Sequence, residues 1–168
     1  MLKDGEWFWG KYKNFIFLKT ADNLGVVQGF WIIDATSGKT LLNSSLDYTQ
    51  PVNIIQNKDK YALKYYLTIV TDCGLAINGK KCWNEMLLKN KISSEKKLEM
   101  PDCMAQIKKE YSEYKKKSEA FKNNAVKMMT YKNFMENNMI ISMEAVIEDI
   151  SNPQIKVSGG KTTCTPQP

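Results

Sequence analysis

Residues 61–69, with the sequence YALKYYLTI, alternate between two classes of side chain. The large apolar side chains at the odd positions fall on one face of an extended chain, and Lys64, Tyr66 and Thr68 fall on the other. A period of two with one apolar face is typical of a half-buried antiparallel strand. We therefore predict that this segment forms a strand of an antiparallel sheet.

The residues before this strand carry further strand signals. The segment 6–18 is dense in aromatic residues, which favour strands, and apolar residues recur in 25–34, 41–48 and 52–56. A polar turn at residues 57–60 leads directly into the strand described above. The N-terminal half is thus predicted to be a β-structure built from consecutive strands.

One stretch of this half, FWIIDATSGKTLL at residues 30–42, ends like a phosphate-binding loop. The full motif needs a glycine five residues before Gly38, and that position is Ile33, which cannot adopt the positive φ that glycine allows. The residues after Thr40 are also a poor helix start, so no helix N-terminus would face a phosphate. We predict a hairpin instead, with a strand to Asp34, a turn at Gly38 and a strand from Thr40.

The second half changes to helical patterns and then returns to strands. Residues 82–88 predict a short helix, and an apolar stripe with spacings of three and four predicts one long amphipathic helix over about 102–131. Residues 139–147 fit both a strand and a helix. We favour a strand, because the turn at 151–154 is followed by apolar residues at 155–157 that complete a C-terminal hairpin.

These patterns together predict an α+β fold. An antiparallel sheet forms from the N-terminal half, the helix over 102–131 packs on it, and the C-terminal hairpin joins it. The alternative for the helix is a seam with a partner chain. The length of 168 residues fits one domain, over residues 1–158, followed by a polar tail at 159–168.

The composition excludes several kinds of site. The chain contains no histidine and no arginine, so all 24 basic residues are lysines and the net charge is +6. Histidine relays, histidine metal ligands and arginine forks for phosphate are therefore absent. We predict no cofactor, no metal site and no enzymatic activity, although a hydrolase built on carboxylates such as Asp34 and Asp72 remains a third hypothesis.

The four cysteines are Cys73, Cys82, Cys103 and Cys164. Their even number and wide spacing favour disulfides over a zinc site, and four cysteines allow three connectivities. Pairing Cys73 with Cys82 would close a short loop and leave Cys103 with Cys164. The alternative is four free thiols in a cytosolic protein.

Disulfides require an oxidising compartment, although residues 1–5 are not a signal peptide. We therefore predict a secreted or periplasmic protein whose leader is absent from this chain, with the cytoplasm as the alternative. No segment of the sequence is apolar enough to span a membrane.

The best candidate for a binding face is a set of aromatic residues interleaved with lysines in the N-terminal half: Trp7, Trp9, Lys11, Lys13 and Trp31. The alternative is that these aromatics fill the core. The first functional hypothesis is a non-enzymatic binding or assembly domain of an exported or envelope-associated protein, with a protein or an anionic envelope polymer as its partner. The second is a cytosolic domain that binds single-stranded nucleic acid through these lysines and tryptophans.

Overall fold

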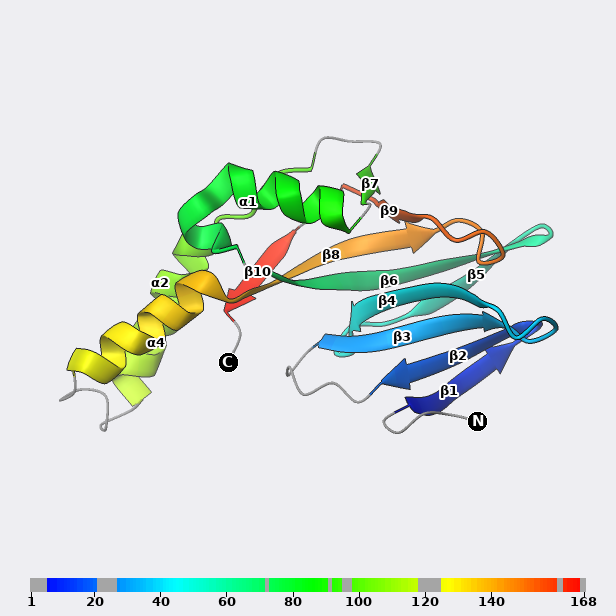
Figure 1. Ribbon diagram of the computed structural model, residues 1–168, viewed down its shortest axis with the longest axis horizontal. Coiled ribbons are helices and arrows are strands. Elements are labelled where there is room, and N and C mark those ends of the chain that lie inside the picture. Colours follow the sequence, from blue (N-terminus) through cyan, green and yellow to red (C-terminus); the bar gives the residue numbers. More distant parts are fainter. Residues whose placement is uncertain are drawn as a thin grey trace.

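A computed structural model describes residues 6–20, 27–71, 73–90, 92–94, 98–117, 125–159 and 162–166. The strands of the N-terminal half are β1 (Glu6–Tyr12), β2 (Phe15–Thr20), β3 (Val27–Asp34), β4 (Thr40–Asp47), β5 (Asn53–Asn57) and β6 (Lys60–Thr71). The second half contains α1 (Leu75–Lys89), β7 (Ser93–Ser94), α2 (Cys103–Lys117), α4 (Ala125–Asn137), β8 (Met139–Ile147), β9 (Ile155–Val157) and β10 (Thr163–Pro166). Figure 1 shows α2 and α4 at one end of the molecule and β1–β4 toward the other, with α1 and β10 between them.

The predicted strand at residues 61–69 is the centre of the sheet. It lies within β6, which pairs with β8 from Leu63 to Thr71 along one edge. Along the other edge β6 pairs first with β5 and then, at Leu67, with Leu46 of β4. All strands of the described residues join one sheet in the order β1-β2-β3-β4-β6-β8-β9-β7, with β5 beside β6 and β10 beside β8. The pairs are antiparallel except β7 with β9, which confirms the predicted α+β fold with an antiparallel sheet.

The hairpin predicted at residues 30–42 is present. β3 ends at Asp34, β4 begins at Thr40, and Gly38 has the positive φ of 68° that the turn requires. The Gly38 N–H donates to the Asp34 carbonyl over 2.8 Å. The Asp34 carboxylate accepts hydrogen bonds from the Thr36 N–H and the Ser37 hydroxyl, which lower its pKa. The Asp34 carboxylate therefore stabilises the turn between β3 and β4.

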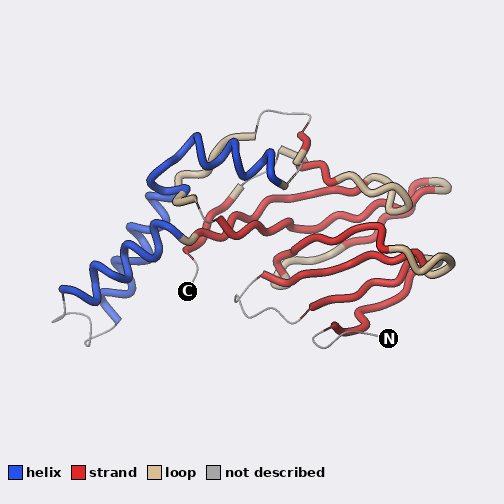
Figure 2. Tube along the Cα trace, viewed as in Figure 1, coloured by secondary structure: helices blue, strands red, loops and turns tan. Residues whose placement is uncertain are grey.

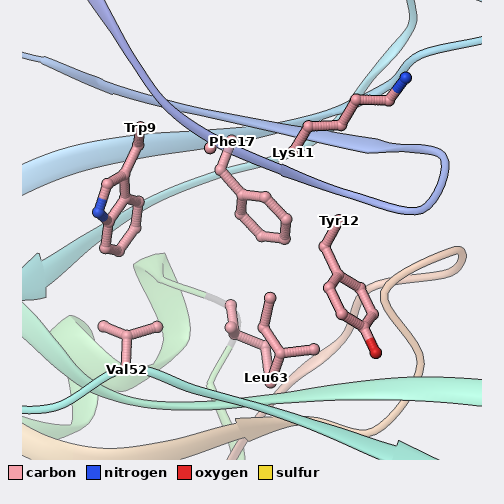
Figure 3. A pocket seen from close by; sticks show the side chains of 8 residues that line it. Trp9, Lys11, Tyr12, Phe17, Val52 and Leu63 are labelled. Carbon is pink, nitrogen blue, oxygen red and sulfur yellow. The ribbon is translucent and has the colours of Figure 1, made fainter.

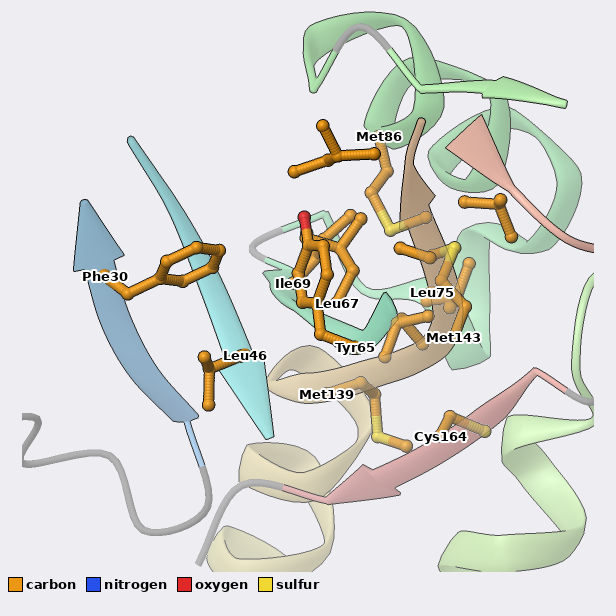
Figure 4. Close-up of a cluster of buried hydrophobic side chains, with 14 of the residues drawn as sticks. Phe30, Leu46, Tyr65, Leu67, Ile69, Leu75, Met86, Met139, Met143 and Cys164 are labelled. Atoms are coloured by element: carbon orange, nitrogen blue, oxygen red, sulfur yellow. The ribbon is translucent and has the colours of Figure 1, made fainter. Parts of the chain in front are cut away.

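The meander β1–β4 turns its apolar face toward β6. In the described part of the chain, the pair Leu46–Leu67 joins the meander to β6 by strand register. The hydroxyls of Ser44 and Ser45 also bond to the Tyr65 hydroxyl and the Thr68 carbonyl, and edge-to-face ring contacts add to these links. Phe30 contacts Tyr65 with ring centroids 5.3 Å apart, and Tyr12 contacts Tyr61 at 5.2 Å. These rings belong to one continuous core, which runs from β3 across β6 to α1 (Figure 4).

The first helix, α1, is longer than the predicted segment 82–88. It packs on the face of β6 and β8 that carries the core residues. It begins after Gly74 and kinks at Gly79, which has non-helical backbone angles. Buried Trp83 and Met86 of this helix pack into the core. The sequence pattern missed its first half because Gly79 interrupts the helical spacing.

The helical segment predicted over 102–131 needs one correction, because the structure has two helices, α2 and α4. They lie side by side and run in opposite directions, with their shared end projecting beyond the sheet (Figure 2). Residues 118–124, over which the single stripe was expected to continue, lie outside the described part of the chain. The predicted start is confirmed, since the Asp102 carboxylate accepts a hydrogen bond from the Ala105 N–H over 3.0 Å.

The C-terminal strands also follow the prediction. Residues 139–147 form β8 with the predicted bounds, and β9 returns antiparallel to it after the turn. Within the segment predicted as a polar tail, residues 163–166 form β10. This strand pairs with residues 139–142 of β8, whereas β9 pairs with residues 145–147. The polar pattern of 159–168 gave no sign of this strand, which is held by register with β8 and by a disulfide.

We expect the Tyr65 hydroxyl to make stability depend on alkaline pH. Burial raises the pKa of Tyr65 to about 12, although its hydrogen bond with Ser44 opposes the shift. Between about pH 10 and pH 12 the folded protein therefore keeps a phenol proton that the unfolded chain has released. The contribution of the buried, neutral phenol to the free energy of unfolding is complete below pH 10 and is lost as the pH rises through 12.

The measurement compares wild type with Tyr65→Phe by urea unfolding at several pH values. Near neutral pH the variant should be less stable by about 1 kcal/mol, because Ser44 loses its partner. Above pH 10 this difference should shrink and change sign, since phenylalanine cannot ionise. A difference that stays constant with pH would contradict the expected burial of the phenol.

Candidate functional site

An apolar cavity lies between the β1–β2 hairpin and the β5–β6 hairpin. Figure 3 shows Trp9, Tyr12 and Phe17 reaching into it from one side and Val52 and Leu63 from the other. Gly10, Ile54 and the backbone of Lys11 complete the lining. We name this cavity the Trp9 pocket.

A β-bulge brings Trp9 into this pocket. Phe8 pairs with Leu18 and Gly10 pairs with Phe17, so the register shifts between Phe8 and Gly10. The extra residue in β1 breaks the alternation of faces. The indole of Trp9 therefore reaches the inner side, where its ring centroid lies 6.3 Å from that of Phe30.

The pocket has a volume of about 280 Å³. Small-molecule sites usually span about 300–1,000 Å³, so this one fits a single aromatic or branched aliphatic group. Its side chains are almost entirely hydrocarbon and offer few polar groups to orient a substrate. Trp9 is 38 % exposed and Ile54 is 36 % exposed, so the mouth of the pocket presents apolar surface to water.

The structure does not bring the predicted binding residues together on one face. Trp31 pairs in register with Leu18, and their side chains lie on the face of the meander opposite to Phe17 and the pocket. Lys11 points away from the pocket (Figure 3), and Lys13 sits exposed in the turn after β1 with a φ of 51°. The backbone of Trp7 pairs with Lys19, whereas its side chain lies outside the described residues. Among the four of these residues whose side chains are described, Trp9 alone places its side chain in the pocket.

The four cysteines pair as the sequence allowed. Cys73 is bonded to Cys82 across the start of α1, and Cys103 of α2 is bonded to Cys164 of β10. The second bond fastens the last strand to the helical hairpin, and both of its cysteines are buried. The sequence interpretation of a disulfide-bonded protein is confirmed in this respect.

The carboxylates named in the hydrolase hypothesis do not form a site in the described structure. Asp34 is engaged in its turn, and Asp72 lies outside the described residues. No group of three or more acidic or cysteine side chains that could hold a metal ion occurs in the described ranges. None of the described helices is long and apolar enough to cross a membrane.

Sequence reasoning missed most of the pocket lining. Tyr12 and Phe17 were noted only as strand-forming aromatics, and Val52, Ile54 and Leu63 only as strand residues. The alternation of Val52 and Ile54 places them on one face, which is a usable signal. What the sequence could not give is the approach of that face to β1, because the contact joins segments about 40 residues apart.

No protein-family model matches this chain, and neither a curated protein nor a solved structure matches it significantly. The residues of the pocket and the two disulfides are therefore the basis for a functional proposal.

Proposed function

We propose that this chain is a non-enzymatic binding domain of an exported or envelope-associated protein, and that the Trp9 pocket takes an apolar side chain of a protein partner. The observation that carries the proposal is the partly exposed, hydrocarbon-lined pocket. Exposed apolar patches and grooves on a protein often mark binding sites, because burying apolar area against a partner is favourable.

The compartment in this proposal rests on the disulfides. The bond between Cys73 and Cys82 closes the start of α1, and the bond between Cys103 and Cys164 joins residues 61 positions apart. No free cysteine remains among the described residues. Such bonds persist where thiols are oxidised, as in the periplasm or outside the cell. An exported protein that stays folded in that environment suits a binding or assembly role.

The chemistry of the pocket favours a protein partner over an anionic envelope polymer. The ammonium group of Lys11 is directed away from the cavity, so none of the described lining residues turns a cation toward its interior (Figure 3). Aromatic and aliphatic anchors buried in such pockets dominate many protein interfaces.

A pair of neighbouring substitutions tests the proposal. Ile54 lines the pocket, whereas Ile55, paired with Ala62, lies on the other face of β5. We expect indole and p-cresol, analogues of tryptophan and tyrosine side chains, to shift the NMR signals of residues around the pocket. Ile54→Glu should weaken this binding at least about tenfold, because a carboxylate at the mouth must be desolvated.

Ile55→Glu is the matched control and should bind as wild type does. Equal binding by both variants, or no shift with either analogue, would remove the pocket as the site.

The nucleic-acid hypothesis needs Trp9 and Trp31 on one platform, and the two lie on opposite faces of the meander. Oligonucleotides should accordingly leave the Trp9 signals unshifted at low salt.

A further inference from the structure

The geometry points to a second binding site, on the outer face of the sheet, for a neutral saccharide unit. The site is a cleft of about 340 Å³ lined by six residues from β4, the turn that follows it, β6, β8 and β10: Asp47, Gln50, Tyr66, Ser142, Glu144 and Thr163. It lies on the face opposite to the core and is separate from the Trp9 pocket, with which it shares no residue. We name it the Tyr66 cleft.

Strand register builds this cleft as two adjacent rows. In the first row Tyr66 of β6 pairs with Glu144 of β8, and Asp47 follows Leu46, whose partner is Leu67. In the second row Ser142 pairs with Thr163 of β10. The alternation of β6 sends Tyr66 to the outer face, because Tyr65 and Leu67 are in the core. The cleft is therefore fixed by ordered strands.

Side chains at the rim are held in place by their own bonds. The Asp47 carboxylate accepts from the Thr49 N–H over 2.9 Å, in the turn that also positions Gln50. The Glu144 carboxylate forms an ion pair with the Lys64 ammonium, with 2.6 Å between Oε1 and Nζ, and this ion pair raises the pKa of Lys64. Each carboxylate keeps further lone pairs, since a carboxylate can accept about four hydrogen bonds.

The mixture of groups matches the chemistry of a sugar. A pyranose has hydroxyls that both donate and accept, together with C–H faces that pack on an aromatic ring. The cleft supplies carboxylate acceptors, an amide, two hydroxyls and the phenol of Tyr66.

Charge selects a neutral ligand. Asp47 and Glu144 carry two negative charges against the single positive charge of Lys64, so the cleft is locally anionic in a chain of net charge +6. The two carboxylates would repel a polyanion. A bound metal ion is disfavoured because the cleft offers only two carboxylates.

The test titrates the whole chain with maltotriose, cellotriose and chitotriose, followed by calorimetry and NMR, up to about 10 mM. We expect at least one of them to bind and to shift signals around the cleft. Tyr66→Ala should weaken binding about tenfold and Gln50→Ala about fivefold, from the lost ring contact and hydrogen bond. Phe8→Ala, which removes an exposed ring outside the cleft, and Ile54→Glu should both bind as wild type does.

Gln50 lies in an exposed turn, so its variant decides the matter even if Tyr66→Ala does not fold. The proposal is overturned if none of the three saccharides binds, or if binding is unchanged in Gln50→Ala and in every folded Tyr66 variant. Because Ile54→Glu alters only the Trp9 pocket, failure of one site can be told from failure of the other.

Discussion

Replacing Cys103 and Cys164 together with alanine is expected to lower the free energy of unfolding by about 4 kcal/mol. The bond joins residues separated by 61 positions, and a cross-link over a longer loop restricts the unfolded chain more strongly. It also holds β10 against α2, so amide protons of β10 should exchange faster in the variant. Urea unfolding without reductant and hydrogen exchange measure the two effects.

The matched control is Cys73→Ala with Cys82→Ala. This bond spans only 9 positions, so its loss should cost less, about 2–3 kcal/mol. Protein isolated from its own source without reductant should show no reactive thiol. Four reactive thiols in that preparation, or a Cys103 and Cys164 variant as stable as wild type, would contradict the role of the disulfides and the oxidising compartment.

Phe30→Ala is expected to destabilise the fold by about 3–5 kcal/mol. The ring is fully buried and contacts both Trp9 and Tyr65, so it connects the pocket to β6 across the core. Its removal leaves a cavity that these neighbours cannot fill without moving. Because Trp9 loses its support, binding of indole in the Trp9 pocket should also weaken.

Phe8→Ala provides the comparison for this change. It removes the same number of atoms from a ring that is 59 % exposed, so stability should change by no more than about 0.5 kcal/mol. Chemical unfolding of the two variants measures both values. Similar costs for Phe8 and Phe30 would mean that the meander does not pack on β6 as described.

Much of the local structure could be predicted from the sequence. Strand β6 has clear alternation, residues 139–147 alternate well enough to favour a strand over a helix, and Gly38 marks the turn between β3 and β4. These signals lie in adjacent residues, where side-chain periodicity and φ preferences act directly. The same is true of the helix start at Asp102.

The candidate sites could be predicted only in part. Trp9 was singled out as a binding residue, but so was Trp31, and the two lie on opposite faces because of strand register and the bulge. The Tyr66 cleft had no sequence signal, since its residues come from strands that are far apart in the chain. A pattern tells which residues share a face of a strand, but not what lies opposite that face.

By itself, the sequence determined an α+β protein with a central strand at residues 61–69, a hairpin in place of a phosphate loop, and cysteines suited to two disulfides. Only the tertiary structure decided which cysteines meet, that β10 joins the sheet, and that Trp9 rather than Trp31 lines a pocket. The physical reason is that alternation and turn propensities act between near neighbours. The pockets and the second disulfide depend on long-range pairing, which follows from how the whole chain buries its apolar faces.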